Sequence, residues 1–139
     1  MTVDADRVRA RLLTIRALLD HLAGLGDVDE AALTRDFGLR LQVERVLSQV
    51  ITLATEINSH VVASELGRAP ADLRRSFDDM ATAGWLPCEL VAEIRDSTGL
   101  RNVLIHEYVE LDLRILAAAV PETLRGYRAY VREVVARLG

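Results

Sequence analysis

Residues 39–66 read LRLQVERVLSQVITLATEINSHVVASEL, the longest stretch of the chain without glycine or proline. Apolar residues recur in it at alternating steps of three and four: Val43, Val46, Val50, Leu53 and Ile57. This spacing places them on one face of an α-helix. Gly67 marks the end of the helix, because glycine readily adopts the conformation of a helix C-cap. The stretch therefore predicts a long amphipathic helix, with His60 as the next residue on the apolar face.

The remaining sequence predicts further helices of the same kind. We expect them over residues 4–23, 70–83, 88–107 and 111–138, with a short helical turn over 29–37. Glycines or prolines separate most of these segments, so the connections are short. Pro121 has no backbone N–H to donate, so we expect the last helix to be kinked or split near Val120. The expected fold is all-α: a single domain over residues 1–139, an up-and-down antiparallel bundle of about five helices.

The composition favours this fold and excludes several classes of protein. Of the 139 residues, 50% are apolar and only 4% are aromatic, which argues against a small β-sandwich or barrel. Cys88 is the one cysteine, so an intrachain disulfide and a cysteine-based metal cage are excluded. No apolar run approaches the roughly 18 residues that cross a bilayer, and the first residues lack a signal pattern. We therefore expect a cytoplasmic protein.

The charge pattern restricts how the chain can meet nucleic acid. All 17 basic residues are arginine, which excludes lysine chemistry and a P-loop, and the net charge is -4. A protein that coats nucleic acid through its overall field is normally basic. Binding of RNA or DNA would therefore require a local cluster of arginines or a cleft assembled from two subunits.

One segment, residues 101–108 with the sequence RNVLIHEY, carries an unusual set of polar groups. Asn102 and His106 are four residues apart, so they share a face of the expected helix. Arg101 and Tyr108 lie seven apart and share a neighbouring face. Arg101 and His106 are offset by about 140° on an ideal helix. Two facing copies of the segment would build a tighter site than one copy, which suggests a dimer.

A guanidinium beside an imidazole suits the cleavage of a phosphodiester without a metal. The imidazole of His106 can move the proton of a ribose 2′-hydroxyl while that oxygen attacks the adjacent phosphorus. The guanidinium of Arg101 can stabilise the negative charge that builds on the phosphoryl oxygens. Asn102 is a supporting residue that orients the histidine or the phosphate. Glu44 and His60, on the long helix, are candidates for lining the same cleft.

The pattern Arg-Asn-x3-His-x-Tyr, formed by Arg101, Asn102, His106 and Tyr108, resembles that of the HepT toxins of the HEPN superfamily. Gly99 and Leu100 before it, and residues 109–112 after it, fit the same resemblance. Further similar segments are residues 41–47, 56–62, 69–77 and 86–91. The resemblance covers residues 5 to 137, but only the Arg-x4-His-x-Tyr part is specific.

The resemblance implies a homodimeric, metal-independent endoribonuclease with Arg101 and His106 as catalytic residues and no cofactor. HepT toxins pair with an MntA-type nucleotidyltransferase antitoxin, which transfers AMP from ATP to the motif tyrosine. The corresponding residue here is Tyr108. The expected partners are therefore RNA, a cognate MntA-like nucleotidyltransferase and a second copy of this chain. Glu107 departs from the small residues often found beside the histidine, and its carboxylate would repel RNA phosphate.

Three alternative interpretations remain at this level. The chain could be a non-catalytic module that binds a nucleotidyltransferase and presents Tyr108 for modification. It could also be a plain dimeric interaction bundle, in which the motif only forms a helix end. Glu56 and His60 are four residues apart and could be metal ligands, although the paired Glu-x-x-His motifs of a dimetal bundle are missing from the sequence.

Overall fold

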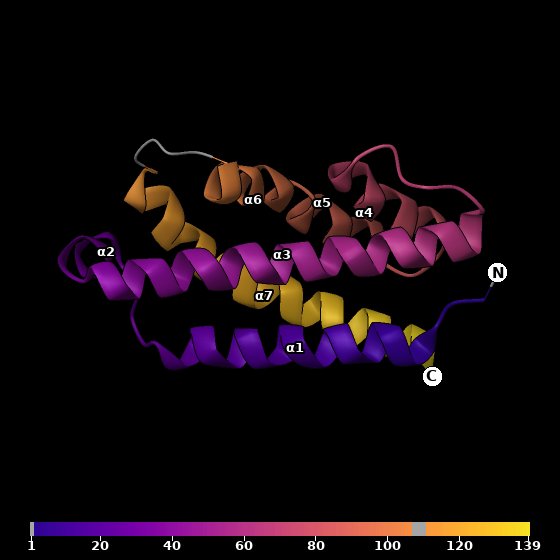
Figure 1. The fold of residues 1–139 in the computed structure, drawn as a ribbon, viewed down its shortest axis with the longest axis horizontal. Helices are drawn as coiled ribbons and strands as arrows, with labels where there is room; N and C mark the ends of the chain where they lie inside the picture. Colours follow the sequence, from indigo (N-terminus) through magenta and orange to yellow (C-terminus); the bar gives the residue numbers. More distant parts are fainter. Residues whose placement is uncertain (1, 107–110) are drawn as a thin grey trace.

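The computed structural model describes residues 2–106 and 111–139, and the described residues form helices and no strand (Figure 1). The all-α prediction is therefore confirmed. There are seven helices in these residues rather than about five. Their bounds are α1 Ala5–Gly24, α2 Glu30–Arg35, α3 Phe37–Leu66, α4 Leu73–Thr82, α5 Cys88–Ile94, α6 Ser97–His106 and α7 Leu113–Leu138.

Aspartate side chains cap the N-termini of five of the helices. Each carboxylate accepts a hydrogen bond from a backbone N–H two or three residues ahead, and the capping residues are Asp4, Asp29, Asp36, Asp72 and Asp112. Such caps satisfy N–H groups that have no partner within the helix. They also correct two predicted boundaries: α3 begins at Phe37 rather than residue 39, and α4 begins at Leu73 rather than residue 70.

The helix α3 lies at the centre of the bundle and contacts α1, α2, α4, α6 and α7. In Figure 1 it runs between α1 below and α6 above, with α7 passing behind it. The apolar stripe predicted for residues 39–66 faces the core, where Val43, Val50 and Ile57 are fully buried. The opposite, polar side of α3 remains open between α1 and α6.

A buried polar network joins α7 to α3 and α4. The hydroxyl of Tyr130 donates a hydrogen bond to Asn58 Oδ1 at 2.7 Å and approaches Ala54 O at 3.1 Å. Asn58 Nδ2 in turn donates to Ser76 Oγ at 3.1 Å. Burial raises the pKa of the Tyr130 hydroxyl well above its usual value. Because buried polar groups are costly when unpaired, this network fixes how the three helices pack.

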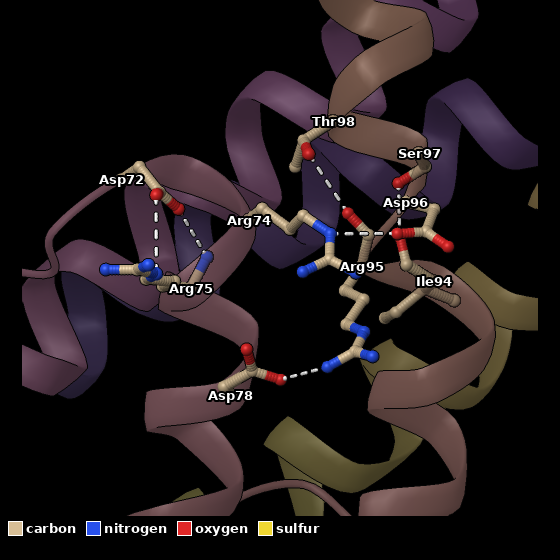
Figure 2. Close-up of polar contacts among 9 residues, drawn as sticks. All are labelled: Asp72, Arg74, Arg75, Asp78, Ile94, Arg95, Asp96, Ser97 and Thr98. Atoms are coloured by element: carbon tan, nitrogen blue, oxygen red, sulfur yellow. Dashed lines mark hydrogen bonds and ion pairs between the residues drawn. The ribbon is translucent and has the colours of Figure 1, made fainter.

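The predicted helix over residues 88–107 is wrong as one element, because the chain breaks between α5 and α6. At the break the backbone N–H groups of Thr98 and Gly99 donate three residues back, to the carbonyls of Arg95 and Asp96, instead of four. Figure 2 shows two side-chain bonds at the same place: Ser97 Oγ donates to Ile94 O and Thr98 Oγ1 donates to Arg95 O, at 2.5 and 3.0 Å. Ion pairs to α4 hold the break in place: Arg74 with Asp96 and Arg95 with Asp78, each at 2.9 Å.

The helix α7 runs without interruption through Pro121, so the predicted split near Val120 is not observed. Further along α7, Gly126 allows a close approach of α5. A Cβ atom at this position would lie 2.5 Å from Ile94 Cγ2.

In the part of the chain that the structure describes, no helix is long and apolar enough to cross a membrane.

Candidate active site

Arg101 lies on α6, which packs against the polar side of α3. Its side chain is partly buried, and its Nε donates a hydrogen bond to Thr52 Oγ1 of α3 at 2.9 Å. Its Nη1 donates to the Oδ1 of the neighbouring Asn102 at 3.2 Å. Two side chains from two helices thus fix the guanidinium, and no further hydrogen bond to it is found among the described residues.

Two cavities meet at Arg101 and together form one groove along α3. The larger, of about 580 Å³, lies between α1, α3 and α6, and the smaller has about 360 Å³. Both are lined by Thr52, Glu56 and Arg101. We call the two cavities together the Arg101 groove. The larger cavity continues to Arg7 on α1 and the smaller one to Arg45 on α3.

The Arg101 groove is basic, although the chain as a whole is acidic. Its lining holds four arginines and one carboxylate, and the charged groups are Arg7, Arg11, Arg45, Arg101 and Glu56. Glu56 pairs with Arg11, with Nε and Oε2 3.1 Å apart. No carboxylate of the described residues pairs with Arg7 or Arg45. The structure therefore contains the local arginine cluster that RNA binding by an acidic chain requires.

His106 is the last residue of α6 and is exposed to solvent. Neither cavity of the Arg101 groove includes it. Arg101 and His106 both lie within the helical range of α6, so the offset of about 140° expected for an ideal helix applies to them. A single chain thus places the guanidinium against α3 and the imidazole at the helix end. The structure does not bring these two side chains into contact.

The other candidate residues occupy different surroundings. His60 lines the larger cavity with Arg101, and its Nε2 accepts a hydrogen bond from the backbone N–H of Asp4 at 2.9 Å. Glu44 pairs with Arg40 on its own helix at 3.2 Å and does not line the Arg101 groove.

Asn102 is exposed and lines a separate cavity together with Arg74 and Asp96. Its side-chain oxygen nevertheless reaches Arg101, as described above, so it contacts the proposed site from the outer side of α6. Tyr108 and Glu107 lie outside the described residues.

The structure also gives Glu56 and His60 roles other than metal binding. Glu56 forms the ion pair with Arg11, and the ring nitrogen of His60 is hydrogen-bonded to the start of α1. A metal ligand must offer an unprotonated nitrogen or a carboxylate oxygen to the ion. Glu56 Oε2 and His60 Nε2 are engaged with other protein groups, and among the described residues no group of three or more histidine, cysteine, aspartate or glutamate side chains could hold a metal ion.

Several residues of the groove were missed by the sequence analysis, above all Thr52, Arg7 and Arg45. A signal for them exists in the polar residues of the long helix, which recur at alternating steps of four and three: Arg45, Gln49, Thr52, Glu56 and Ser59. A polar stripe of this kind is also typical of a helix face that is exposed to solvent. Only the packing of α1 and α6 beside it shows that it lines a groove.

Comparison with known proteins gives a family match over most of the chain. Residues 14–134 match the family described as ribonuclease HepT-like. A tRNA nuclease HepT of Aphanizomenon flos-aquae is 30% identical over 128 residues, which cover 91% of this chain and 86% of that protein. An mRNA nuclease HepT of Shewanella oneidensis is 25% identical over 103 residues, covering 74% of this chain and 77% of that protein.

Solved structures share the fold. A tri-AMPylated HEPN toxin of Shewanella oneidensis, in complex with an MNT antitoxin, superposes with a TM-score of 0.83 at 23% identity. The match covers 94% of this chain and 98% of that toxin chain. A toxin–antitoxin structure with AMP-PNP gives a TM-score of 0.81 at 22% identity, over 93% of this chain and 98% of the other.

Proposed function

The chain belongs to the ribonuclease HepT-like family, and from this premise we propose that it is the endoribonuclease toxin of a toxin–antitoxin pair. The observation that carries the proposal is the setting of Arg101. Its guanidinium is held by Thr52 at the centre of an arginine-rich groove, five residues before an exposed histidine. Charge stabilisation and proton transfer to and from RNA thus have a separate group each.

The proposed reaction is attack of a ribose 2′-hydroxyl on the adjacent phosphorus. His106 accepts the hydroxyl proton as the new P–O bond forms, and the bond to the 5′-oxygen of the next nucleotide breaks. That leaving oxygen takes up a proton, which gives a 2′,3′-cyclic phosphate and a 5′-hydroxyl. Arg101 stabilises the charge on the non-bridging oxygens through charge-assisted hydrogen bonds. Asn102 holds the guanidinium through its side-chain oxygen. No metal ion takes part in these steps.

The functional unit is proposed to be a homodimer in which the two copies of α6 face one shared cleft. The support comes from the placement of Arg101 and His106, which do not meet within one chain. Facing subunits would bring the imidazole of one copy toward the guanidinium of the other. Pairing also concentrates positive charge in one place, which an acidic monomer of net charge -4 needs in order to attract RNA.

The proposed control of the enzyme is adenylylation of Tyr108 by an MntA-like nucleotidyltransferase antitoxin. The support is the position of Tyr108 two residues after His106 in the motif. One solved structure with the same fold is a tri-AMPylated HEPN toxin in complex with an MNT antitoxin. The phenolic oxygen attacks the α-phosphate of ATP, pyrophosphate leaves, and the phenolic proton passes to a base of the transferase. The attached AMP then places a phosphodiester where the RNA phosphate would bind Arg101.

Growth of cells that carry the chain under an inducible promoter tests this function. Induction of the wild type is expected to stop growth, and Arg101→Ala and His106→Ala are each expected to relieve the block. Arg125→Ala and His21→Ala are matched controls at exposed positions outside the site and should remain toxic. Circular dichroism must show equal helicity for all variants. Toxicity of His106→Ala equal to that of the wild type would overturn the proposed role and favour a non-catalytic interaction module.

A further inference from the structure

We propose that the Arg101 groove binds the RNA backbone on both sides of the cleaved phosphate, with Arg7 at one end and Arg45 at the other. This inference rests on the proposed ribonuclease function and adds the substrate path to it. The path follows the polar residues of α3 that line the two cavities. The helices α1 and α6 flank α3 (Figure 1).

The length of the groove exceeds that of a single phosphodiester. Arg45 and Ser59 line opposite ends of it, each seven residues from Thr52, the residue that holds Arg101. At a rise of 1.5 Å per residue, each arm extends about 10 Å along α3. Each arm therefore extends past the phosphate beside Arg101 and can accompany the strand on that side. A strand cleaved beside Arg101 would therefore continue into both cavities.

The charges at the two ends suit phosphate. Among the described residues, neither Arg7 nor Arg45 has a carboxylate partner, whereas the acid of the groove, Glu56, pairs with Arg11. A guanidinium can donate two parallel hydrogen bonds to phosphate oxygens. Along the groove, the hydroxyl of Ser59 and the amide of Gln49 can bond to sugar and phosphate oxygens.

The lining also indicates which part of the RNA is contacted. Among the described residues, neither cavity is lined by phenylalanine, tyrosine or tryptophan, so the groups on which bases could stack are the imidazole of His60 and the arginine guanidiniums. Contacts to backbone position a nucleic acid without reading its sequence. The groove is therefore suited to hold many RNA sequences through their phosphates, and a choice among RNAs would have to come from features outside it.

Binding of a labelled, fully 2′-O-methylated RNA oligonucleotide tests the path directly, because this probe cannot undergo 2′-hydroxyl attack. Arg7→Gln and Arg45→Gln are each expected to weaken binding about three- to tenfold. Each should also reduce the slope of log affinity against log salt by about 0.7, as expected for one lost phosphate contact on a single strand. Arg125→Gln, the same change on the exposed side of α7, should bind like the wild type.

Cleavage kinetics separate this proposal from the function on which it rests. The loss of kcat/KM in Arg7→Gln and Arg45→Gln should be larger for a long RNA than for a dinucleoside monophosphate, which does not reach the groove ends. A wild type that cleaves RNA, with both variants matching it in affinity and salt slope, would overturn the path alone. A wild type that binds the O-methylated RNA but cleaves no RNA would overturn the function alone.

The same variants distinguish an RNA path from a protein interface. Sedimentation of Arg7→Gln and Arg45→Gln should give the same oligomeric state as the wild type. A change of oligomeric state with unchanged RNA affinity would show that this face binds a second protein instead, and would overturn the proposal. Failure of the wild type to bind the O-methylated RNA would overturn it as well.

Discussion

Arg101 on α6 and Thr52 on α3 are 49 positions apart in sequence, yet the Nε of the arginine donates a hydrogen bond of 2.9 Å to the threonine hydroxyl oxygen. This bond points the guanidinium into the groove instead of leaving it to move freely on the helix surface. Thr52 is thus a positioning residue, which acts through Arg101.

Loss of the Thr52 hydroxyl should lower the rate of the chemical step. We expect Thr52→Val to reduce kcat about tenfold with little change in KM, since a hydrogen bond to a charged group contributes about 1.5 kcal/mol or more. Thr52→Ser keeps the hydroxyl and should retain most of the activity. Single-turnover cleavage of a labelled RNA measures both effects. Equal kcat values for the valine variant and the wild type would show that Thr52 does not position Arg101 for the reaction.

The buried network around Tyr130 should contribute to stability and not to chemistry. Tyr130→Phe leaves the Oδ1 of Asn58 without its partner, so we expect the free energy of unfolding to fall by about 1–3 kcal/mol. Denaturation by urea measures this loss. Cleavage at temperatures well below melting should remain at the wild-type rate. A variant as stable as the wild type would show that the network is not needed for packing.

Buried tyrosines should also make the fold sensitive to alkali. Burial raises the pKa of Tyr127 and Tyr130 above their usual value. The folded state thus favours the neutral phenol, and this contribution is fully present below the unfolded pKa of about 10. It is lost as pH rises beyond that value, because the unfolded chain ionises first. Unfolding free energies measured between about pH 8 and 11 should fall steeply for the wild type and less steeply for Tyr130→Phe.

A shared cleft predicts complementation between inactive subunits. Neither Arg101→Ala nor His106→Ala should cleave RNA alone. Mixed after dissociation and reassociation, they form heterodimers in which one of the two sites combines an intact arginine of one subunit with an intact histidine of the other. We expect partial recovery of cleavage in the mixture. Full activity of a stable wild-type monomer in light scattering, or no recovery in a mixture shown to contain heterodimers, would contradict this arrangement.

Adenylylation should occur on Tyr108 and should block the nuclease without unfolding it. After co-expression with the cognate nucleotidyltransferase, intact-mass and peptide mass spectrometry should find AMP on Tyr108 and not on the buried Tyr127 or Tyr130. Tyr108→Phe should escape inhibition while keeping its helical circular dichroism signal. AMP on another tyrosine, or full neutralisation of the phenylalanine variant by an active transferase, would contradict the mechanism.

Much of the fold follows from local patterns in the sequence. The apolar steps of three and four in residues 39–66 correctly identified the face of α3 that is buried. The break between α5 and α6 was missed because apolar spacing continues across it. At the break the backbone bonds of Thr98 and Gly99 span three residues instead of four, and ion pairs to α4 hold Arg95 and Asp96. Periodicity does not record such contacts with another segment.

Most of the candidate residues that the sequence indicated lie in one short motif, and His60 of the long helix, which was also indicated, lines the larger cavity. Arg101, Asn102 and His106 form one short motif, so their types and spacing were visible together. Thr52, Arg7 and Arg45 come from other segments and reach the groove only through the packing of α1 and α6 against α3. Charge counting set a requirement for RNA binding, a local arginine cluster, but one sequence without its fold could not say which of 17 arginines lie together.

One assay tests directly whether Arg101 and His106 cleave RNA without a metal ion. Purified wild-type protein is incubated with labelled RNA in excess chelator, beside His106→Ala and Arg101→Ala, and the product ends are identified. We expect cleavage by the wild type alone, with 2′,3′-cyclic phosphate and 5′-hydroxyl ends on the products. Cleavage that the chelator abolishes, or cleavage by His106→Ala at the wild-type rate, would contradict it.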